Sequence, residues 1–328
     1  ITAYLVSNAI IIPMTGWLSR FFGRKRYLIF SISLFTGSSL LCGSAWSLQS
    51  LILFRIFQGI GGGGLQPLSQ AILLETFPPH QHGIAMALFG VGIMFGPILG
   101  PLLGGWITDN WSWHWIFFIN IPIGILSLIM TMFFIEDPSY VKGVKMKVDY
   151  WGFIFLAVGL GCLQVVLDKG QREDWFSSGF IIWLSVASVV SLTFFVLVEI
   201  FTENPIVNLK TFRNLSFTTG NAVMFFTFFN LFGSIVLLPI YVQTLMGYTA
   251  SLAGMVLGPA GMVSLIAMPM AGRLITRMNP KLILAFGIVV SAYSTHLMSQ
   301  FNLSADFYTI VWPRAVLGLG MGFLFIPL

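Results

Sequence analysis

Charged residues are scarce in this chain. Asp, Glu, Lys and Arg together make up 8% of its 328 residues, 57% are hydrophobic, and the mean hydropathy is +0.91. A soluble domain of this length needs a much larger charged fraction. Apolar runs of about 18–25 residues, long enough to cross a hydrocarbon core, recur along the whole chain. These features predict an all-α polytopic membrane protein and exclude a soluble globular fold.

Cysteines and catalytic signatures are nearly missing as well. Only Cys42 and Cys162 are present, both inside apolar runs and without a C-x-x-C motif, which indicates packing residues and not a redox or metal site. The chain contains no H-E-x-x-H, no G-x-S-x-G and no paired aspartates in the middle of an apolar run. We therefore expect a protein that is not an enzyme and has no metal or other cofactor.

Eleven apolar segments are predicted to span the membrane as helices. Their approximate ranges are 1–18, 27–47, 50–75, 84–107, 114–135, 150–168, 179–201, 217–243, 249–271, 281–300 and 306–328. Twelve of the 16 cations lie in loops on one side of these spans, whereas only Lys169 and Arg172 lie on the other side. The positive-inside rule places the cation-rich side, including loop 19–26, in the cytoplasm. The same rule accounts for the net charge of +5 without a nucleic-acid partner.

Two short elements of the sequence occur twice. P-M-T-G-W-L at 13–18 returns as P-M-A-G-R-L at 269–274, and R-x-x-x-G-x-G-x-G at 55–63 returns at 314–322. The copies are 256 and 259 residues apart, and eight predicted spans separate them. An even number of spans gives both copies the same orientation, as in transporters built from two parallel repeats.

The register of this repeat predicts a larger architecture. The chain opens and closes inside apolar runs, and the unmatched spans predict one further span before Ile1 and two after Leu328, fourteen in all. Each half then has six spans, with an inserted pair between them. We expect an N-terminal bundle at 1–135, the inserted pair with its flanking loops at 136–216, and a C-terminal bundle at 217–328.

A glycine-flanked basic loop connects the first two predicted spans. The stretch 16–26 reads G-W-L-S-R-F-F-G-R-K-R and resembles the cytoplasmic signature G-x-L-x-D-R-x-G-R-K of the major facilitator superfamily. Gly16 and Gly23 are suited to a sharp turn and a close helix approach. Arg24 and Lys25 can bind helix ends or acids in one conformation and release them in another. Arg20 stands where the family has Asp, which weakens the case for a charge relay through that position.

The first copy of the arginine–glycine element lies inside a predicted span. Leu51, Arg55, Gln58, Gly59 and Gly61 resemble the motif in the fourth span of proton-driven drug exporters. Arginine at mid-helix costs about 2.5–3.5 kcal/mol on insertion scales, so its side chain should face the bundle interior and find a partner. We assign Arg55 and Gln58 to proton coupling, and Gly59 and the second-copy Arg314 to conformational switching. The G-x-G-x-x-G match at 59–64 lacks the preceding strand that a dinucleotide site requires.

Glycine also recurs every fourth residue in the fourth predicted span, at Gly92, Gly96, Gly100 and Gly104, together with Pro97 and Pro101. This stretch resembles the antiporter signature of drug exporters. Such spacing forms a groove that admits another helix closely, and the prolines favour a bend. A plain packing face is the alternative; the resemblance favours a flexible seam that takes part in switching.

Three further blocks extend the resemblance over nearly the whole chain. They are W-H-W-I-F-F-I-N-I-P-I-G at 113–124, D-Y-W-G at 149–152 and N-P-I-V-N-L at 204–209. They are similar to blocks of EmrB/QacA-type multidrug:proton antiporters, the fourteen-span branch of the major facilitator superfamily. The resemblance implies export of hydrophobic or cationic drugs across the inner (plasma) membrane, driven by the proton gradient. In Gram-negative bacteria it also implies a periplasmic membrane-fusion adaptor and an outer-membrane channel. A uniporter or symporter for a defined solute such as a sugar is the alternative.

The acidic residues lie in loops or at span edges, so the sequence offers no proton carrier at mid-membrane. In the family this carboxylate commonly belongs to the first span, which the register places before Ile1; we expect Arg55 to pair with it, with Glu75 as a weaker candidate. Polar and aromatic side chains in the central spans are candidates for substrate binding. They are Tyr4, Asn8, Gln66, Gln70, Asn221, Phe225, Asn230, Tyr241 and Gln243.

Overall fold

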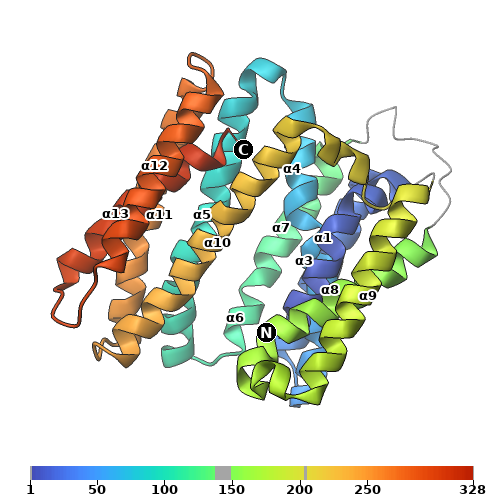
Figure 1. The fold of residues 1–328 in the computed structure, drawn as a ribbon, viewed down its shortest axis with the longest axis horizontal. Helices are drawn as coiled ribbons and strands as arrows, with labels where there is room; N and C mark the ends of the chain where they lie inside the picture. Colours follow the sequence, from blue (N-terminus) through green and yellow to red (C-terminus); the bar gives the residue numbers. More distant parts are fainter. Residues whose placement is uncertain (1, 137–148, 203–204, 328) are drawn as a thin grey trace. The chain divides into compact units, whose positions relative to one another are not determined.

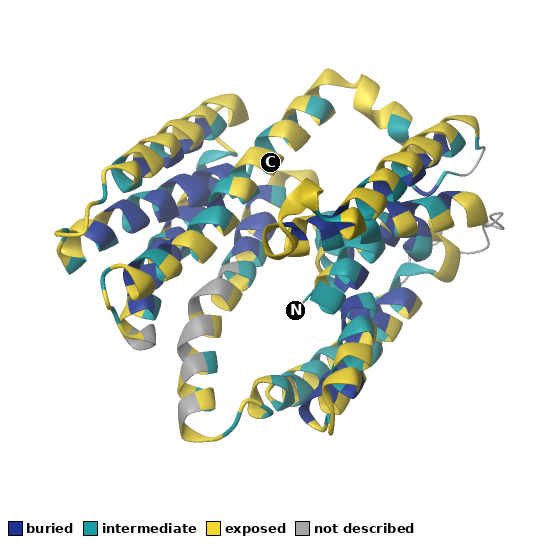
Figure 2. Cartoon of the chain, turned by 60° about the horizontal axis from the view of Figure 1, so that its bottom comes forward, coloured by how far each residue is buried: buried dark blue, intermediate teal, exposed yellow. Residues whose placement is uncertain are grey.

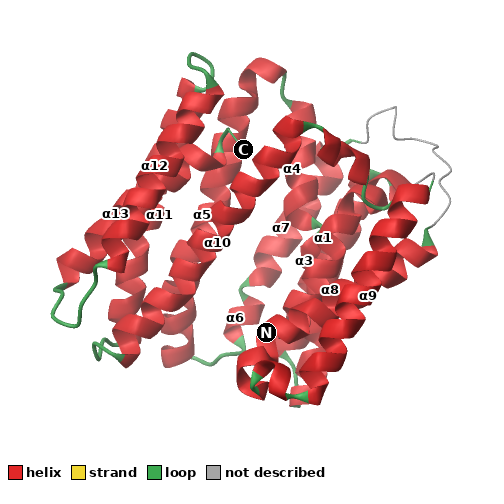
Figure 3. Ribbon diagram, viewed as in Figure 1, coloured by secondary structure: helices red, strands yellow, loops and turns green. Residues whose placement is uncertain are grey.

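The structure is a computed structural model that describes residues 2–136, 149–202 and 205–327. Within these ranges every regular element is a helix (Figure 3), which confirms the predicted all-α class. The chain divides into two compact units, one of residues 1–72 and 112–213 and the other of residues 73–111 and 214–328. The three predicted segments, 1–135, 136–216 and 217–328, were defined by the sequence repeat and not by contacts between residues. That division stays a prediction.

The first unit is organised around α3. This helix (Leu48–Gly63) packs against α1 (Thr2–Phe22) and α2 (Arg24–Gly43), while the hairpin of α8 (Tyr150–Lys169) and α9 (Gly179–Phe201) packs against α1 through α8 (Figure 1). The other elements are α6 (Trp115–Phe118), α7 (Asn120–Phe134) and the 3-10 helices η3 (Gly170–Glu173), η4 (Trp175–Ser177) and η5 (Leu209–Arg213). The boundary between the units falls inside α4 (Leu65–Thr76), after Ile72.

The second unit is organised around α11 (Ala250–Leu274), which packs against α5 (His82–Asn110), α10 (Leu215–Thr244) and α13 (Phe307–Phe325). In addition, α12 (Pro280–Ser299) packs against α13, and the 3-10 helix η1 (Pro79–Gln81) precedes α5. At the closest approach of α5 and α11, a Cβ built on Gly272 would lie 2.7 Å from the carbonyl oxygen of Gly83. A side chain on Gly272 would collide with that backbone, so the two helices pack this closely because Gly272 has none.

Eight helices in the described ranges are long and apolar enough to cross a membrane. They coincide with eight of the eleven predicted spans. The other three predicted spans, 1–18, 50–75 and 84–107, are helical but are not among these eight, and α5 contains positions that lie outside the described residues. The segment 50–75 is not one continuous helix, because a turn at Gly64 divides it into α3 and α4, of 16 and 12 residues. Those three spans stay predictions as membrane crossings.

Burial in this chain runs opposite to the pattern of a soluble protein. Serines and glycines fill many of the helix contacts, whereas many large apolar side chains are exposed. Exposed positions run along most helices (Figure 2). Phe133, Phe201 and Trp183, for example, are 80%, 83% and 75% exposed. Apolar surface of this extent is stable in lipid and not in water. The chain is therefore a multi-pass membrane protein.

Candidate transport site

The glycines of the first repeat element lie where α3 contacts its two neighbours. On Gly59 and Gly63 a Cβ would meet α1, and the one on Gly59 would lie 2.5 Å from the carbonyl oxygen of Tyr4. On Gly61 it would lie 2.5 Å from the backbone nitrogen of Phe35 in α2. Side-chain carbons do not approach backbone atoms this closely, so glycine is required at each contact.

The second copy of the element makes the same contacts in the other unit. A Cβ on Gly318 or Gly322 would collide with α11, at Ala260 in the first case, and a Cβ on Gly320 would collide with Ser291 of α12. The partner residues repeat in register as well, since Ala260 follows Tyr4 by 256 residues. The repeat seen in the sequence is therefore a repeat of helix packing, in which α1, α2 and α3 correspond to α11, α12 and α13.

The correspondence extends to the first turn of each helix. Ser47 caps α3 by accepting a hydrogen bond from the amide of Ser50 at 3.1 Å. Asp306, 259 residues later, caps α13 by accepting one from the amide of Thr309, also at 3.1 Å. Both caps satisfy amide groups that the helix leaves without an internal partner.

Arg55 heads a short polar chain in the first unit. Its Nη1 donates to Oε1 of Gln58 at 2.7 Å, and Nε2 of Gln58 donates to Oγ of Ser39 on α2 at 2.6 Å. The guanidinium also lies 4.5 Å from the ring centre of Tyr4 and 5.5 Å from that of Phe117, within the range of cation–π attraction. Among the described residues its partners are thus an amide and two rings, not a carboxylate.

Arg314 has a different environment in the second unit. Its side chain is 2% exposed, Nη1 donates to Oγ of Ser234 on α10 at 2.7 Å, and Nε has no acceptor in the described ranges. The residue that corresponds to Gln58 is Leu317, which is fully buried. Beside the guanidinium lies a small void of about 20 Å³, large enough for a single water molecule.

In the basic loop, Gly23 forms the turn between two helices and Lys25 binds the end of a third, as their residue types predict. Gly23 adopts a φ of 86° between α1 and α2, a left-handed conformation that favours glycine. Lys25 donates to the carbonyl oxygen of Met132 in the last turn of α7 at 2.8 Å, where the helix dipole favours a cation. Arg24 is the first residue of α2 and is half-buried. The close helix approach expected at Gly16 is not found, because no described atom lies within 4 Å of a Cβ built there.

The glycine series of α5 is also open in the described part of the chain. No atom lies within 4 Å of a Cβ built on Gly92, Gly96, Gly100 or Gly104. Within the second unit, α5 contacts α11 through another face, which contains Gly83 and Gly90. The side chains of Pro97 and Pro101 lie outside the described residues. A close helix contact along the glycine series stays a prediction.

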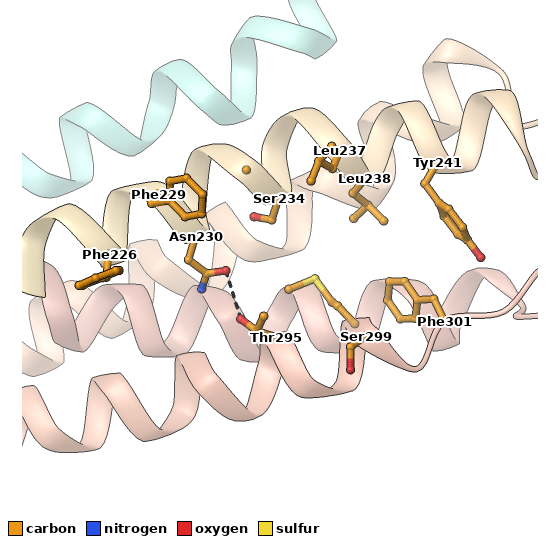
Figure 4. Close-up of a pocket in the computed structure, with 12 residues that line it drawn as sticks. Phe226, Phe229, Asn230, Ser234, Leu237, Leu238, Tyr241, Thr295, Ser299 and Phe301 are labelled. Atoms are coloured by element: carbon orange, nitrogen blue, oxygen red, sulfur yellow. Dashed lines mark hydrogen bonds between the residues drawn. The ribbon is translucent and has the colours of Figure 1, made fainter. Parts of the chain in front are cut away.

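Two of the predicted substrate residues lie in one cavity. Asn230 and Tyr241 of α10 line a cavity of about 690 Å³ between α10 and α12 (Figure 4). Oδ1 of Asn230 accepts a hydrogen bond from Oγ1 of Thr295 at 3.1 Å. The other lining residues are mostly aromatic or aliphatic, and none carries a formal charge: Phe226, Phe229, Gly233, Ser234, Leu237, Leu238, Met298, Ser299 and Phe301.

The remaining substrate candidates are dispersed. Phe225 and Asn221 line a second hollow of about 490 Å³ on α10. Gln243, also on α10, is exposed. The others belong to α1, where Tyr4 contacts Arg55 and Asn8 lies beside Gly59, and to α4, where Gln66 is exposed and Gln70 is half-buried.

Sequence reasoning missed the contribution of α12 to the larger cavity. Thr295, Met298 and Ser299 come from this helix. Their spacing of three and four residues puts them on one helix face, and that periodicity was the available signal. The polar chain from Gln58 to Ser39 was missed as well, because a serine in an apolar helix is an ordinary packing residue.

The Major Facilitator Superfamily model matches residues 1–328. Together with the duplicated helix packing and the multi-pass architecture, this match shows that the chain belongs to the major facilitator superfamily.

Over its whole length the chain is similar to curated proteins named for multidrug export and for fatty acid resistance. It is 39% identical over 329 residues to the multidrug export protein EmrB of Haemophilus influenzae and 37% identical over 328 residues to the fatty acid resistance protein FarB of Neisseria gonorrhoeae. In both cases the alignment covers 100% of this chain and 64% of the relative. The crystal structure of the human organic anion transporter MFSD10 matches 99% of the chain and 67% of that structure, with a TM-score of 0.68 and 16% identity. The predicted resemblance to the EmrB type is confirmed.

Proposed function

We propose that the protein is a secondary active transporter that exports hydrophobic or cationic drugs in exchange for protons by alternating access. The observation that supports it best is the cavity between α10 and α12, read together with the relatives named for drug export and fatty acid resistance. Its wall of Phe, Leu and Met side chains suits apolar ligands of varied shape, because such side chains repack around different molecules. Asn230, Thr295 and Tyr241 add a few polar groups that can orient a ligand.

Proton coupling is assigned to Arg55 and Gln58. The guanidinium is held in place by Gln58 and by the rings of Tyr4 and Phe117, so it is oriented before any acid approaches. A carboxylate beside it would be stabilised in its charged form, and separation from Arg55 would favour proton uptake. The identity of this carboxylate stays a prediction.

Conformational switching is assigned to the basic loop, to the glycine series of α5 and to the two arginine–glycine elements. The bond from Lys25 to the end of α7 is of the kind that can form in one state and break in the other. Open glycine positions on α5 leave space for another helix to slide or dock during the transition. The proton gradient is the proposed energy source, without a bound cofactor.

The proposed location is the inner membrane, with loop 19–26 in the cytoplasm, in agreement with the distribution of cations. In a Gram-negative cell, a periplasmic membrane-fusion adaptor and an outer-membrane channel are the proposed partners. They would carry the exported compound beyond the outer membrane.

Everted membrane vesicles that contain the whole transporter test this function. When the lumen is made acidic, a lipophilic cationic dye should accumulate inside, and a protonophore should abolish the accumulation. Vesicles without the transporter are the control. Absence of gradient-driven dye movement across a broad panel of hydrophobic and cationic compounds contradicts the proposal. Movement of a sugar out of the acidic lumen together with protons would favour the symporter alternative.

A further inference from the structure

A buried carboxyl group lies in the first unit, away from Arg55. Glu199 belongs to the last turn of α9 and is only 3% exposed. Both of its carboxyl oxygens are buried without a hydrogen-bond partner among the described residues. The amides of Ile206 and Val207, which follow α9 in the chain, face it but lie outside hydrogen-bonding geometry. An ionised carboxylate in such a place would forfeit its hydration without compensation.

A second carboxyl group lies beside the first. Asp149 caps α8, since its Oδ1 accepts a hydrogen bond from the amide of Gly152 at 2.8 Å. Its Oδ2 is buried and has no partner in the described ranges. Oδ2 of Asp149 and Oε1 of Glu199 are both among the nearest atoms to the position of a Cβ on Gly152. Glycine at this position therefore leaves room for two carboxyl groups to lie next to each other.

In the part of the chain that the structure describes, no buried cation lies beside this pair to balance its charge. The adjoining cluster is apolar and consists of Met14, Trp17, Leu156, Phe195 and Ile206. On the neighbouring α1 and η5, the cations Arg20, Lys210 and Arg213 are exposed. Arg20 instead bonds the carbonyl oxygen of Gly16. Two adjacent carboxyl groups without a buried cation cannot both be ionised at low cost.

We propose that Asp149 and Glu199 form a proton-binding pair that shares one proton at the end of the α8–α9 hairpin. This pair is separate from the hydrogen-bonded side chains of Arg55, Gln58 and Ser39. The shared proton lets one carboxyl donate to the other and removes one buried negative charge. This is the hairpin end that the positive-inside rule predicts to be cytoplasmic. The pair therefore responds to cytoplasmic pH, not to the pH on the opposite side.

The direction in which pH changes stability follows from which protonation form of the pair is buried at lower cost. With the proton bound, the pair is compatible with the apolar cluster around Trp17 and with the packing of Ile206. Loss of the proton at higher pH adds a buried charge and weakens this packing. Raising the pH should therefore destabilise the hairpin and free the segment that follows α9.

Thermal unfolding of the purified protein as a function of pH tests the proposal. Between about pH 6 and about pH 9, the wild-type midpoint should fall as pH rises. Glu199→Gln keeps the size of the side chain but cannot ionise, and it should remove most of that fall. Glu173→Gln in η3 is the matched control, because Glu173 is exposed; its profile should follow the wild type. The readout is stability, so failure of the drug-export proposal would leave this test intact.

Infrared spectroscopy supplies a second readout. A protonated carboxylic acid band should be present in the wild type near neutral pH and absent from Glu199→Gln. If Glu199→Gln does not fold, Asp149→Asn replaces it, since Asn also caps helices. If neither variant folds, absence of the band from the wild type still decides against the pair. A wild-type protein without that band, or a pH profile that Glu199→Gln leaves unchanged, overturns the proposal.

Discussion

The two arginine–glycine elements share a scaffold and differ at the arginine. In α3 and in α13 the glycines meet the neighbouring helices at corresponding positions, and the caps Ser47 and Asp306 begin the two helices at corresponding residues. Arg55, however, is half-buried and bonded to Gln58, whereas Arg314 is almost fully buried and bonded to Ser234.

The two elements differ in a way that distinguishes residues needed for helix packing from residues needed for a chemical role. The glycines occur in both copies because both units need the same close helix contacts. Gln58 occurs in one copy only, and Leu317 takes its place in the other. A polar side chain that the scaffold does not require in both copies indicates a function particular to the first unit. This difference supports the assignment of proton coupling to Arg55 and of a structural or switching role to Arg314.

The largest expected effect concerns the shared scaffold. Gly318→Val and Gly59→Val each place side-chain carbons against backbone atoms of a neighbouring helix, so each should lower the free energy of unfolding by about 1–3 kcal/mol or prevent folding. Gly96→Val is the control, because no described atom lies within 4 Å there. Its free energy of unfolding should differ from wild type by only a few tenths of a kcal/mol. Thermal unfolding in detergent measures all three. Tolerance at one repeat glycine and not at the other would break the structural equivalence.

An intermediate effect is expected where the copies differ. Gln58→Leu gives the first copy the residue of the second and removes the acceptor of Arg55. A hydrogen bond to a charged group contributes about 1.5–3 kcal/mol, so gradient-driven export should fall about tenfold or more. Leu317→Gln, the reciprocal change, offers Arg314 an acceptor and should leave export within about twofold of wild type. Equal losses in both variants would mean that the two arginines share one role.

The smallest effect concerns the two caps. Ser47→Ala should lower stability by about 1 kcal/mol at every pH, because serine does not titrate. Hydrogen bonds from the Thr309 side chain and then from its amide lower the pKa of Asp306. The stabilisation by Asp306 is therefore present above the ordinary pKa of Asp and is lost as pH falls through the lowered value.

Asp306→Ala should accordingly destabilise the protein at neutral pH and have less effect in strong acid, whereas Asp306→Asn retains a cap. Pairs of thermal unfolding profiles at neutral and acid pH check this prediction. A penalty for Asp306→Ala that does not depend on pH would contradict the assigned cap.

Much of the fold could be predicted because a helix that crosses a membrane needs a long apolar run. Apolar runs located eight helices that are able to cross a membrane, and the spacing around Arg55 and Arg314 revealed the repeat. The turn at Gly64 was missed, since hydropathy continues across it and only the backbone shows the interruption. No described atom packs against the glycines at 92, 96, 100 and 104, so a close helix contact along that face stays a prediction.

The candidate site was less predictable from the sequence. Asn230 and Tyr241 were identified because they are polar groups in apolar segments, yet their joint cavity depends on α12, whose register against α10 is a matter of packing. Glu199 was placed at a helix end, where a carboxylate is usually solvated. Its burial beside Asp149 results from contacts between residues 50 positions apart, which no local pattern reports.

Proton release in everted vesicles that contain the whole transporter tests the central claim most directly. In the wild type, addition of a drug substrate should release protons from an acidified lumen. Arg55→Ala should still bind the drug but lose this release about tenfold or more, since a charge-assisted interaction is removed. Proton release by Arg55→Ala at the wild-type rate, with wild-type export, would contradict the assignment of proton coupling to the first arginine–glycine element.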